Sequence, residues 1–272
     1  MTALTLQWPT QQVQNHLCAL HPDFNVEVLH QTDSTNTQLL SRLRQGNTTP
    51  TLLVAEDQTA AKGRMGKSWS VQPGHSLTFS FLIPTQLENI GWLALVTACA
   101  LISVLQKKLP HQHHTNTLKI KWPNDIWFKP APGLQWHKLA GILIETSTAN
   151  RQRYAVIGVG INISPLCAPP SSHIPYGYLQ QIDPDWDVPT TFAHIAPELI
   201  QAVYNFNKEG IPHWEILFRH YDLLLGQPLR TSNGIEGIGA GVNPQGHLLI
   251  KTPCGIQPIH SGEISVRPCS DI

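Results

Sequence analysis

The chain has 272 residues with 41% hydrophobic and 13% charged residues, and its 18 basic and 18 acidic side chains cancel. This length accommodates one large domain with a substantial core and a small second domain. Zero net charge argues against broad attraction to nucleic acid or to anionic membranes. No stretch reaches the roughly 18 uninterrupted apolar residues of a membrane span, and the first residues lack the pattern of a secretory signal. The five scattered cysteines form no Cys-x-x-Cys pair, so we expect reduced thiols in a cytoplasmic protein.

The first part of the chain alternates predicted helices and strands. N-cap residues at 33–36 precede apolar leucines at helical spacing, which predicts a helix there. The segment 58–73 has no apolar periodicity and is rich in small and basic residues, so we interpret it as a loop. The other predicted elements are helices at 9–20 and 89–109 and strands at 25–30, 51–56 and 76–83.

The remainder predicts more strands, two helices and a β-rich end. A strand at 118–122 leads into a Pro-Asn-Asp turn, and a hairpin follows at 138–146 and 154–163. Proline-rich residues 164–189 read as an irregular surface excursion, and helices are predicted at 191–208 and 212–224. We therefore predict an α+β fold with helices packed on one side of a mixed sheet, over residues 1–222. Residues 223–272 are expected to form a small β-barrel domain of about five strands.

The most informative segment is the loop Gln58-Thr59-Ala60-Ala61-Lys62-Gly63-Arg64-Met65-Gly66-Lys67-Ser68-Trp69. Glycines allow close approach of the backbone to an anion, and lysine and arginine can surround phosphate or carboxylate oxygens. Ala61-x-x-x-x-Gly66-Lys67-Ser68 also resembles a Walker A loop, but the helix that must follow such a loop is missing from the pattern. A solvated basic loop is the alternative for this segment taken alone.

Three further motifs combine charge with small residues. Lys121-Trp122-Pro123-Asn124-Asp125 delivers a cation, an amide and a carboxylate to the end of a strand. Lys138-x-x-Gly141-Ile-Leu-x-Glu145 begins a strand with a cation and leaves space at its glycine. Gly158-x-Gly160-x-Asn162 is weak as an isolated signal.

Together with Ser34-Thr35-Asn36, these motifs occur in an order that resembles the catalytic domain of biotin–protein ligases, over about residues 28–165. That resemblance implies the biotin ligase catalytic fold, which is similar to class II aminoacyl-tRNA synthetases. The β-rich end resembles the family's SH3-like C-terminal domain. The implied substrates are ATP and biotin, with Mg²⁺ as the cofactor and a biotin carboxyl carrier protein as the acceptor.

The resemblance also implies residue roles. Lys138, Arg64 and Lys62 would be catalytic. The residues implied for biotin are Ser34, Thr35, Asn36, Gln58, Lys62, Gly63, Arg64, Lys138 and Gly141. Those implied for ATP or the adenylate are Arg64, Trp69, Lys121, Asn124, Lys138 and Asn162, with Asp125 as a magnesium ligand.

Two departures and two rival functions qualify this picture. The family's usual Gly-Arg-Gly-Arg opening is Ala61-Lys62-Gly63-Arg64 here, which keeps the charge at 62 but loses a bidentate fork. A lipoate–protein ligase or lipoyl/octanoyl transferase shares the fold, and a non-catalytic biotin-binding module is the second rival. About 27 residues precede the first catalytic strand, too few for the DNA-binding module of some members, so we expect no DNA or membrane partner and a monomer or weak homodimer. The His111-Gln112-His113-His114 tract is interpreted as a surface turn rather than a metal site.

Overall fold

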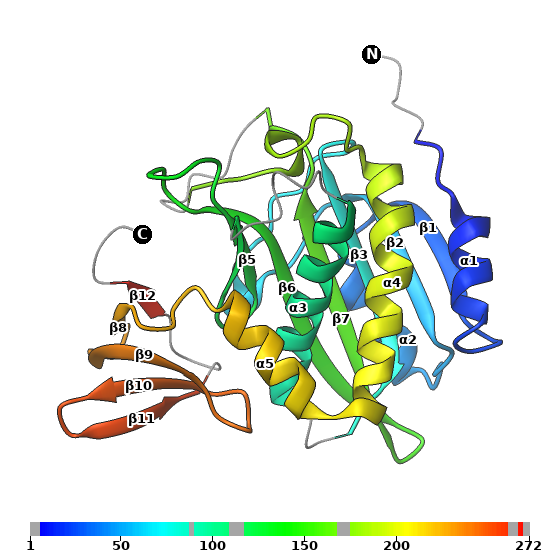
Figure 1. Cartoon of the computed structure of the whole chain (residues 1–272). Helices are drawn as coiled ribbons and strands as arrows, with labels where there is room; N and C mark the ends of the chain where they lie inside the picture. The colour runs from blue at the N-terminus through cyan, green and yellow to red at the C-terminus, as the bar shows by residue number, and fades with distance from the viewer. Residues whose placement is uncertain (1–5, 87–89, 109–116, 168–174, 261–265, 269–272) are drawn as a thin grey trace.

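Two β-sheets organise the computed structural model, which describes residues 6–86, 90–108, 117–167, 175–260 and 266–268 (Figure 1). The larger sheet has seven strands in the order β1-β2-β3-β7-β6-β5-β4. Strands β1 and β2 are parallel and every other neighbouring pair is antiparallel, so the sheet is mixed, as predicted. Its strands are β1 (Asn25–Thr32), β2 (Thr51–Gln58), β3 (Ser76–Pro84), β4 (Leu118–Lys121), β5 (Asp125–Phe128), β6 (His137–Ala149) and β7 (Gln152–Asn162).

Strand β5 is the one element of this sheet that the sequence did not predict. The pattern indicated only a turn after Trp122, whereas the chain reverses within 122–124 and returns antiparallel to β4. Four residues are too few to display an alternating pattern, and Ile126, Trp127 and Phe128 are all buried. Asp125 at its start consequently lies opposite Gly141 of β6.

Within the described residues, five α-helices accompany the sheet, close to the predicted positions. Asp187 starts α4 three residues earlier than predicted, because its side chain accepts a hydrogen bond from Thr190 N at 2.7 Å. Gly210, with φ of 74°, separates the last two helices. The helices are α1 (Thr10–Cys18), α2 (Thr35–Arg44), α3 (Ile90–Lys108), α4 (Val188–Glu209) and α5 (Ile211–Tyr221).

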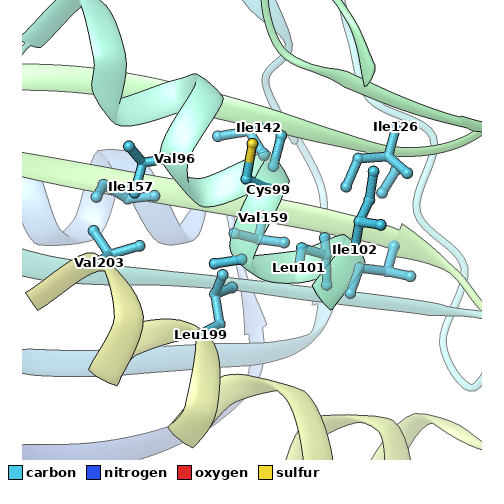
Figure 2. Close-up of a cluster of buried hydrophobic side chains, with 14 of the residues drawn as sticks. Val96, Cys99, Leu101, Ile102, Ile126, Ile142, Ile157, Val159, Leu199 and Val203 are labelled. Carbon is cyan, nitrogen blue, oxygen red and sulfur yellow. The ribbon is translucent and has the colours of Figure 1, made fainter. Parts of the chain in front are cut away.

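One face of the large sheet forms the main hydrophobic core with α1, α3, α4 and α5. Along β7, Ile157, Val159 and Ile161 point to this face, opposite Ile144, Ile142 and Ala140 of β6. Figure 2 shows α3 residues between these strands and Leu199 and Val203 of α4. Because side chains alternate along a strand, every second residue of each inner strand is committed to this core.

Helix α2 lies on the opposite face, where Leu39, Leu40 and Leu43 pack on Leu53, Leu82 and Val156. The prediction of helices on one side is therefore right for four helices and wrong for α2. Helical periodicity identifies the apolar stripe of a helix but not the side of the sheet that receives it. The α2 packing covers only part of this face. The remainder, which carries Gly141 of β6 and Gly158, Gly160 and Asn162 of β7, is the site face.

Helix α3 is long and apolar enough, by composition, to cross a membrane: its mean hydropathy is 1.7 over 18 residues. Most of that stretch, 67%, is buried inside the protein, between the sheet and α4 (Figure 2). Trp92, Leu95, Cys99 and Ile102 are all buried in the core. Its apolar composition is therefore explained by its central place in the core.

The smaller sheet is antiparallel, in the order β11-β10-β9-β8-β12, which confirms a small C-terminal β unit. Closure into a barrel and a domain boundary between 222 and 223 stay predictions. Trp92 Nε1 donates to Pro244 O at 2.9 Å, and Trp122 Nε1 donates to Gly246 O at 3.0 Å, so the β9–β10 turn is held against the larger unit. The strands are β8 (Pro228–Thr231), β9 (Glu236–Val242), β10 (Leu248–Thr252), β11 (Gly255–Ile259) and β12 (Val266–Pro268). The histidine tract at 111–114 lies outside the described residues.

Candidate active site

The uncovered part of the site face is lined with glycine. Gly158, Gly160 and Asn162 alternate along β7 with the core-facing isoleucines and valine, and Gly141 of β6 pairs with Gly160. A side chain at these positions would collide with neighbours: an added Cβ at Gly160 would lie 2.7 Å from the Trp69 ring, and one at Gly141 2.9 Å. The glycines therefore make a floor that admits a large group directly onto the sheet.

Trp69 occupies this floor, with its indole over Gly141 and Gly160. Its backbone N–H donates to Ala61 O at 2.9 Å, which closes the base of the basic loop. Within the described residues its buried indole Nε1 has no hydrogen-bond acceptor. The predicted stacking residue thus stands at the floor of the site with a donor available to a ligand.

Residues 61–69 of the predicted 58–73 loop fold into a narrow hairpin. Lys62 pairs with Ser68, and Gly63 N donates to Lys67 O at 2.7 Å. The tip is the 3₁₀ turn η1 (Arg64–Gly66), in which Met65 has φ of 55° and is exposed. A groove of about 600 Å³ lies between the hairpin and β6, lined by Lys62, Gly63, Arg64, Met65, Gly66, Leu143, Ile144 and Glu145.

Lys138 brings positive charge to the floor. Its Nζ lies 2.7 Å from Asp125 Oδ1 and 5.2 Å from the centre of the Trp69 ring. The contact with Asp125 is an ion pair without hydrogen-bond geometry, so the ammonium keeps donors for another anion. Both side chains are about one-fifth exposed, at 22% and 18%, so solvent screening of the pair is reduced.

A second cation reaches the same end of the site from the hairpin. Arg64 Nη1 donates to Asn124 Oδ1 at 3.2 Å, and Asn124 Nδ2 donates to Ile142 O at 2.8 Å. Burial lowers the pKa of Arg64, and the negative charge of Asp125 acts in the opposite direction. Asn124 consequently connects the hairpin tip to the edge of β6.

Four of the predicted biotin-binding residues gather at the other end of the site face, at the start of α2, whereas the others lie on the hairpin and the floor described above. Ser34 is the N-cap of this helix, and its hydroxyl accepts from Thr37 N at 3.5 Å. Thr35 N donates to Gln58 Oε1 at 2.8 Å, and Asn36 Nδ2 donates to Glu145 Oε2 at 2.9 Å. Ser34, Thr35 and Asn36 are all buried. The structure therefore brings Ser34, Thr35, Asn36 and Gln58 into one polar cluster.

The two remaining predicted nucleotide residues, Lys121 and Asn162, also have protein partners. Lys121 Nζ lies 4.7 Å from the centre of the Trp127 ring. Asn162 Nδ2 donates to Lys138 O at 3.2 Å and to Gly177 O at 2.9 Å. Asn162 thus braces the strand that carries Lys138, a backbone role that the motif did not reveal.

Comparison with known proteins identifies the family. Residues 28–162 match the Biotin/lipoate A/B protein ligase family, and residues 229–267 match the Biotin protein ligase C terminal domain. The chain is 32% identical over 252 residues to the bifunctional ligase/repressor BirA of Escherichia coli, covering 89% of this chain and 74% of BirA. The chain belongs to the biotin/lipoate A/B protein ligase family.

Other members of this family agree in length and in fold. The biotin–[acetyl-CoA-carboxylase] ligase of Mycobacterium tuberculosis is 25% identical over 257 residues, 88% of each chain. The structure of the biotin protein ligase from Aquifex aeolicus in complex with biotin and ATP is similar with a TM-score of 0.72 and 28% identity, over 90% of this chain and 99% of that one. The relatives from Mycobacterium tuberculosis and Aquifex aeolicus are named biotin ligases, which favours that activity over a lipoate ligase or lipoyl/octanoyl transferase.

Two residues of this site, Ser80 and Glu145, were not predicted from the sequence to have a role. Ser80 of β3 lies between Thr35 and Asn36, within hydrogen-bond distance of both. Glu145 was quoted in a motif but given no role, although it holds the amide of Asn36. A signal existed for Ser80: it alternates with Phe79 and Phe81, which face the core, so its hydroxyl is expected on the opposite face.

Magnesium was predicted at Asp125. In the parts of the chain that the structure describes, no group of three or more His, Cys, Asp or Glu side chains could enclose a metal. Mg²⁺ commonly uses one or two protein carboxylates together with substrate phosphates. Asp125 lies beside Lys138 at the floor, and magnesium at this carboxylate stays a prediction.

Proposed function

We propose that this chain is a biotin–protein ligase, which adenylates biotin with ATP and then transfers biotin to a lysine of a biotin carboxyl carrier protein. The observation that carries this proposal is the site face itself. A cationic end with Lys138, Arg64 and Asn124 stands at one side of a glycine floor, and the polar cluster stands at the other. Biotin adenylate matches this arrangement, because its polar ring would meet the polar cluster and its acyl phosphate would meet the cationic end.

In the first step, a carboxylate oxygen of biotin would attack the α-phosphorus of ATP. The bond from that phosphorus to the β-phosphate oxygen breaks, pyrophosphate leaves, and a mixed anhydride forms. Lys138 would neutralise charge on the carboxylate and then on the α-phosphate, and Arg64 would assist from the hairpin. The protein then contributes positioning and charge stabilisation, without a covalent enzyme intermediate.

In the second step, the unprotonated amine of the carrier lysine would attack the acyl carbon of the anhydride. The acyl–oxygen bond to AMP breaks, an amide forms, and the amine loses a proton to solvent. Cationic Lys138 and Arg64 would favour the neutral form of an arriving lysine by lowering its pKa. The hairpin at 61–69 would shield the anhydride from water until the carrier docks.

ATP would bring magnesium with its phosphates, and Asp125 would be the protein carboxylate beside it. Bound there, the ion would neutralise phosphate charge and orient the pyrophosphate leaving group. Trp69 would pack against the nucleotide end of the adenylate. A cytoplasmic location, a monomeric or weakly dimeric state and the absence of DNA and membrane partners stay predictions.

The test is to incubate the protein with Mg-ATP, biotin and an isolated biotin carrier domain and to record the carrier's intact mass, with lipoate in a parallel reaction. We expect one biotin added, and no addition when the carrier lysine is replaced by arginine. Modification by lipoate alone would contradict the proposal in favour of the sister activity. No modification by either acid would contradict both and favour the non-catalytic biotin-binding module.

A further inference from the structure

A chain of hydrogen bonds crosses the site face from β2 to β6. Thr35 N donates to Gln58 Oε1 at 2.8 Å, and the Thr35 hydroxyl lies 2.7 Å from the Ser80 hydroxyl. Ser80 Oγ lies 2.5 Å from Asn36 Oδ1, and Asn36 Nδ2 lies 2.9 Å from Glu145 Oε2. The proposed function gives no role to Glu145, which closes this chain.

The carboxylate of Glu145 fixes the orientation of the Asn36 amide. A carboxylate only accepts hydrogen bonds, so the amide nitrogen of Asn36 must face it. The flipped amide would place two oxygens 2.9 Å apart beside a negative charge. Asn36 Oδ1 therefore faces Ser80, in space that exists because residue 158 is glycine: an added Cβ there would collide with this oxygen.

This orientation determines the direction of each remaining hydrogen bond. An amide oxygen has no proton, so Ser80 must donate to Asn36. Ser80 then has no hydrogen left, and Thr35 must donate to Ser80. The Thr35 hydroxyl approaches Gln58 Oε1 only at 3.4 Å, and that oxygen already accepts the Thr35 backbone N–H.

Two polar groups are left with one role each. The Thr35 hydroxyl can only accept from a ligand, because its hydrogen is committed to Ser80. The bond from the Thr35 backbone N–H fixes the orientation of the Gln58 amide, so its nitrogen is the donor that Gln58 can offer. A ligand that meets both must carry an N–H beside a hydrogen-bond acceptor, as a cyclic urea does.

We infer that Glu145 is a positioning residue that sets the polarity of this chain and thereby makes the site select a ring N–H. The inference rests on the proposed function and deepens it, since the dithiolane ring of lipoate offers neither an N–H nor a comparable acceptor. Thr35 is 3% exposed, so a ligand group at its hydroxyl would be shielded from water. A mismatched group there leaves two acceptors facing each other and is expected to bind at least about 10-fold more weakly.

The experiment compares biotin with two carbamate analogues, in which one or the other ring N–H is replaced by oxygen. Their dissociation constants are measured by calorimetry without ATP for wild type, Glu145→Leu and Glu145→Gln. The matched control is Glu198→Leu, which removes a half-buried carboxylate with a single lysine partner, on α4. The KM values for biotin and ATP are measured in parallel.

Wild type is expected to reject one carbamate by about 10-fold or more. Glu145→Leu is expected to weaken biotin binding by about 10-fold and to reduce that discrimination to less than about threefold, because Asn36 can then flip. Its KM for ATP should stay within about twofold of wild type. Glu145→Gln retains an acceptor for Asn36 and should recover most of the biotin affinity, and Glu198→Leu should behave as wild type.

Unchanged discrimination in a folded Glu145→Leu variant overturns the inference, as does an equal rise of both KM values, which would indicate a structural role only. If that variant does not fold, Ser80→Ala tests the same point, because it releases the Thr35 hydroxyl without a change of charge. Retained discrimination in Ser80→Ala would likewise overturn the inference. A wild type that neither binds biotin nor modifies the carrier defeats the proposed function as well, whereas an active wild type with indifferent variants defeats the inference alone.

Discussion

The two faces of the seven-stranded sheet are built from the same strands and differ in nearly every property. The core face carries Ile157, Val159 and Ile161 of β7 under four helices. The site face of the same strand carries Gly158, Gly160 and Asn162, with a tryptophan and a lysine above them. Adjacent residues of β7 therefore serve different purposes: one packs in the core and the next lines the site.

Stability and activity are thus encoded separately, in alternating residues of the same strands. Burial of large side chains on the core face supplies the free energy of folding, which allows the site face to keep space, charge and polar groups that contribute little to it. Substitutions on the core face should therefore change the unfolding free energy and leave the kinetic constants nearly unchanged. Substitutions on the site face should do the reverse.

The largest effect is expected for Lys138→Ala. Loss of the cation at the floor should reduce kcat for adenylate formation by about 10²–10³-fold, the usual cost of removing one group that stabilises transition-state charge. Pyrophosphate release measures the rate, and urea unfolding measures stability. Lys107→Ala is the control, since Lys107 pairs with Glu198 among the helices. A decrease of less than fivefold in kcat for Lys138→Ala would contradict the claim that Lys138 stabilises charge during adenylate formation.

Ile157→Ala should have the opposite profile. Ile157 is fully buried, and its truncation should lower the unfolding free energy by about 2–5 kcal/mol through lost burial and a cavity. Well below the melting temperature, kcat/KM for biotin should stay within about twofold of wild type. Chemical denaturation and initial rates on the same preparation make the comparison. A large kinetic defect in the folded variant would show that the faces are not independent.

The core side also contains a buried ionisable group, Asp222, at the end of α5. Burial raises its pKa to about 6, against backbone hydrogen bonds from Leu224 and Leu225 and the charge of Lys119. Since the folded state holds this proton more tightly, Asp222 lowers stability as pH rises through the range from about 4 to 6.

Asp222→Asn should remove that dependence and leave the protein about 2–3 kcal/mol more stable than wild type at pH 7, with little difference at pH 4. Asparagine can still accept from Leu224 N. Urea unfolding at several pH values measures the effect. Equal pH profiles for the two proteins would show that Asp222 carries no such penalty.

Gly160→Ala should have the smallest effect in this series. The new Cβ would displace Trp69 from the floor and raise KM for ATP on the order of tenfold, with a stability change of about 1 kcal/mol or less. A double-mutant cycle with Trp69→Ala isolates the contact, because the alanine at 160 should matter little once the indole is gone. Additive effects in this cycle would mean that Gly160 acts without Trp69.

Much of this arrangement could be predicted from the sequence, because strand alternation and helix caps are local properties. The sequence placed a loop at 58–73, the cations Arg64 and Lys138 and the polar motif at 34–36, and the structure brings them to one face. That residues 61–69 of this loop form a hairpin is known only from the structure. The side of the sheet taken by α2 could not be predicted, since it depends on which surface the other helices leave uncovered. The backbone role of Asn162 and the link from Glu145 to Asn36 also escaped, because both depend on partners distant in sequence.

The most direct test of the account is a crystal structure of this chain with biotin and a non-hydrolysable ATP analogue. We expect the ligands to bind on the site face, with the biotin ring at Thr35 and Gln58 and its carboxylate beside Lys138. The nucleotide should lie next to Trp69, over Gly141 and Gly160. Ligand bound elsewhere, with this glycine floor unoccupied and Trp69 still in its place, would contradict the division between the two faces.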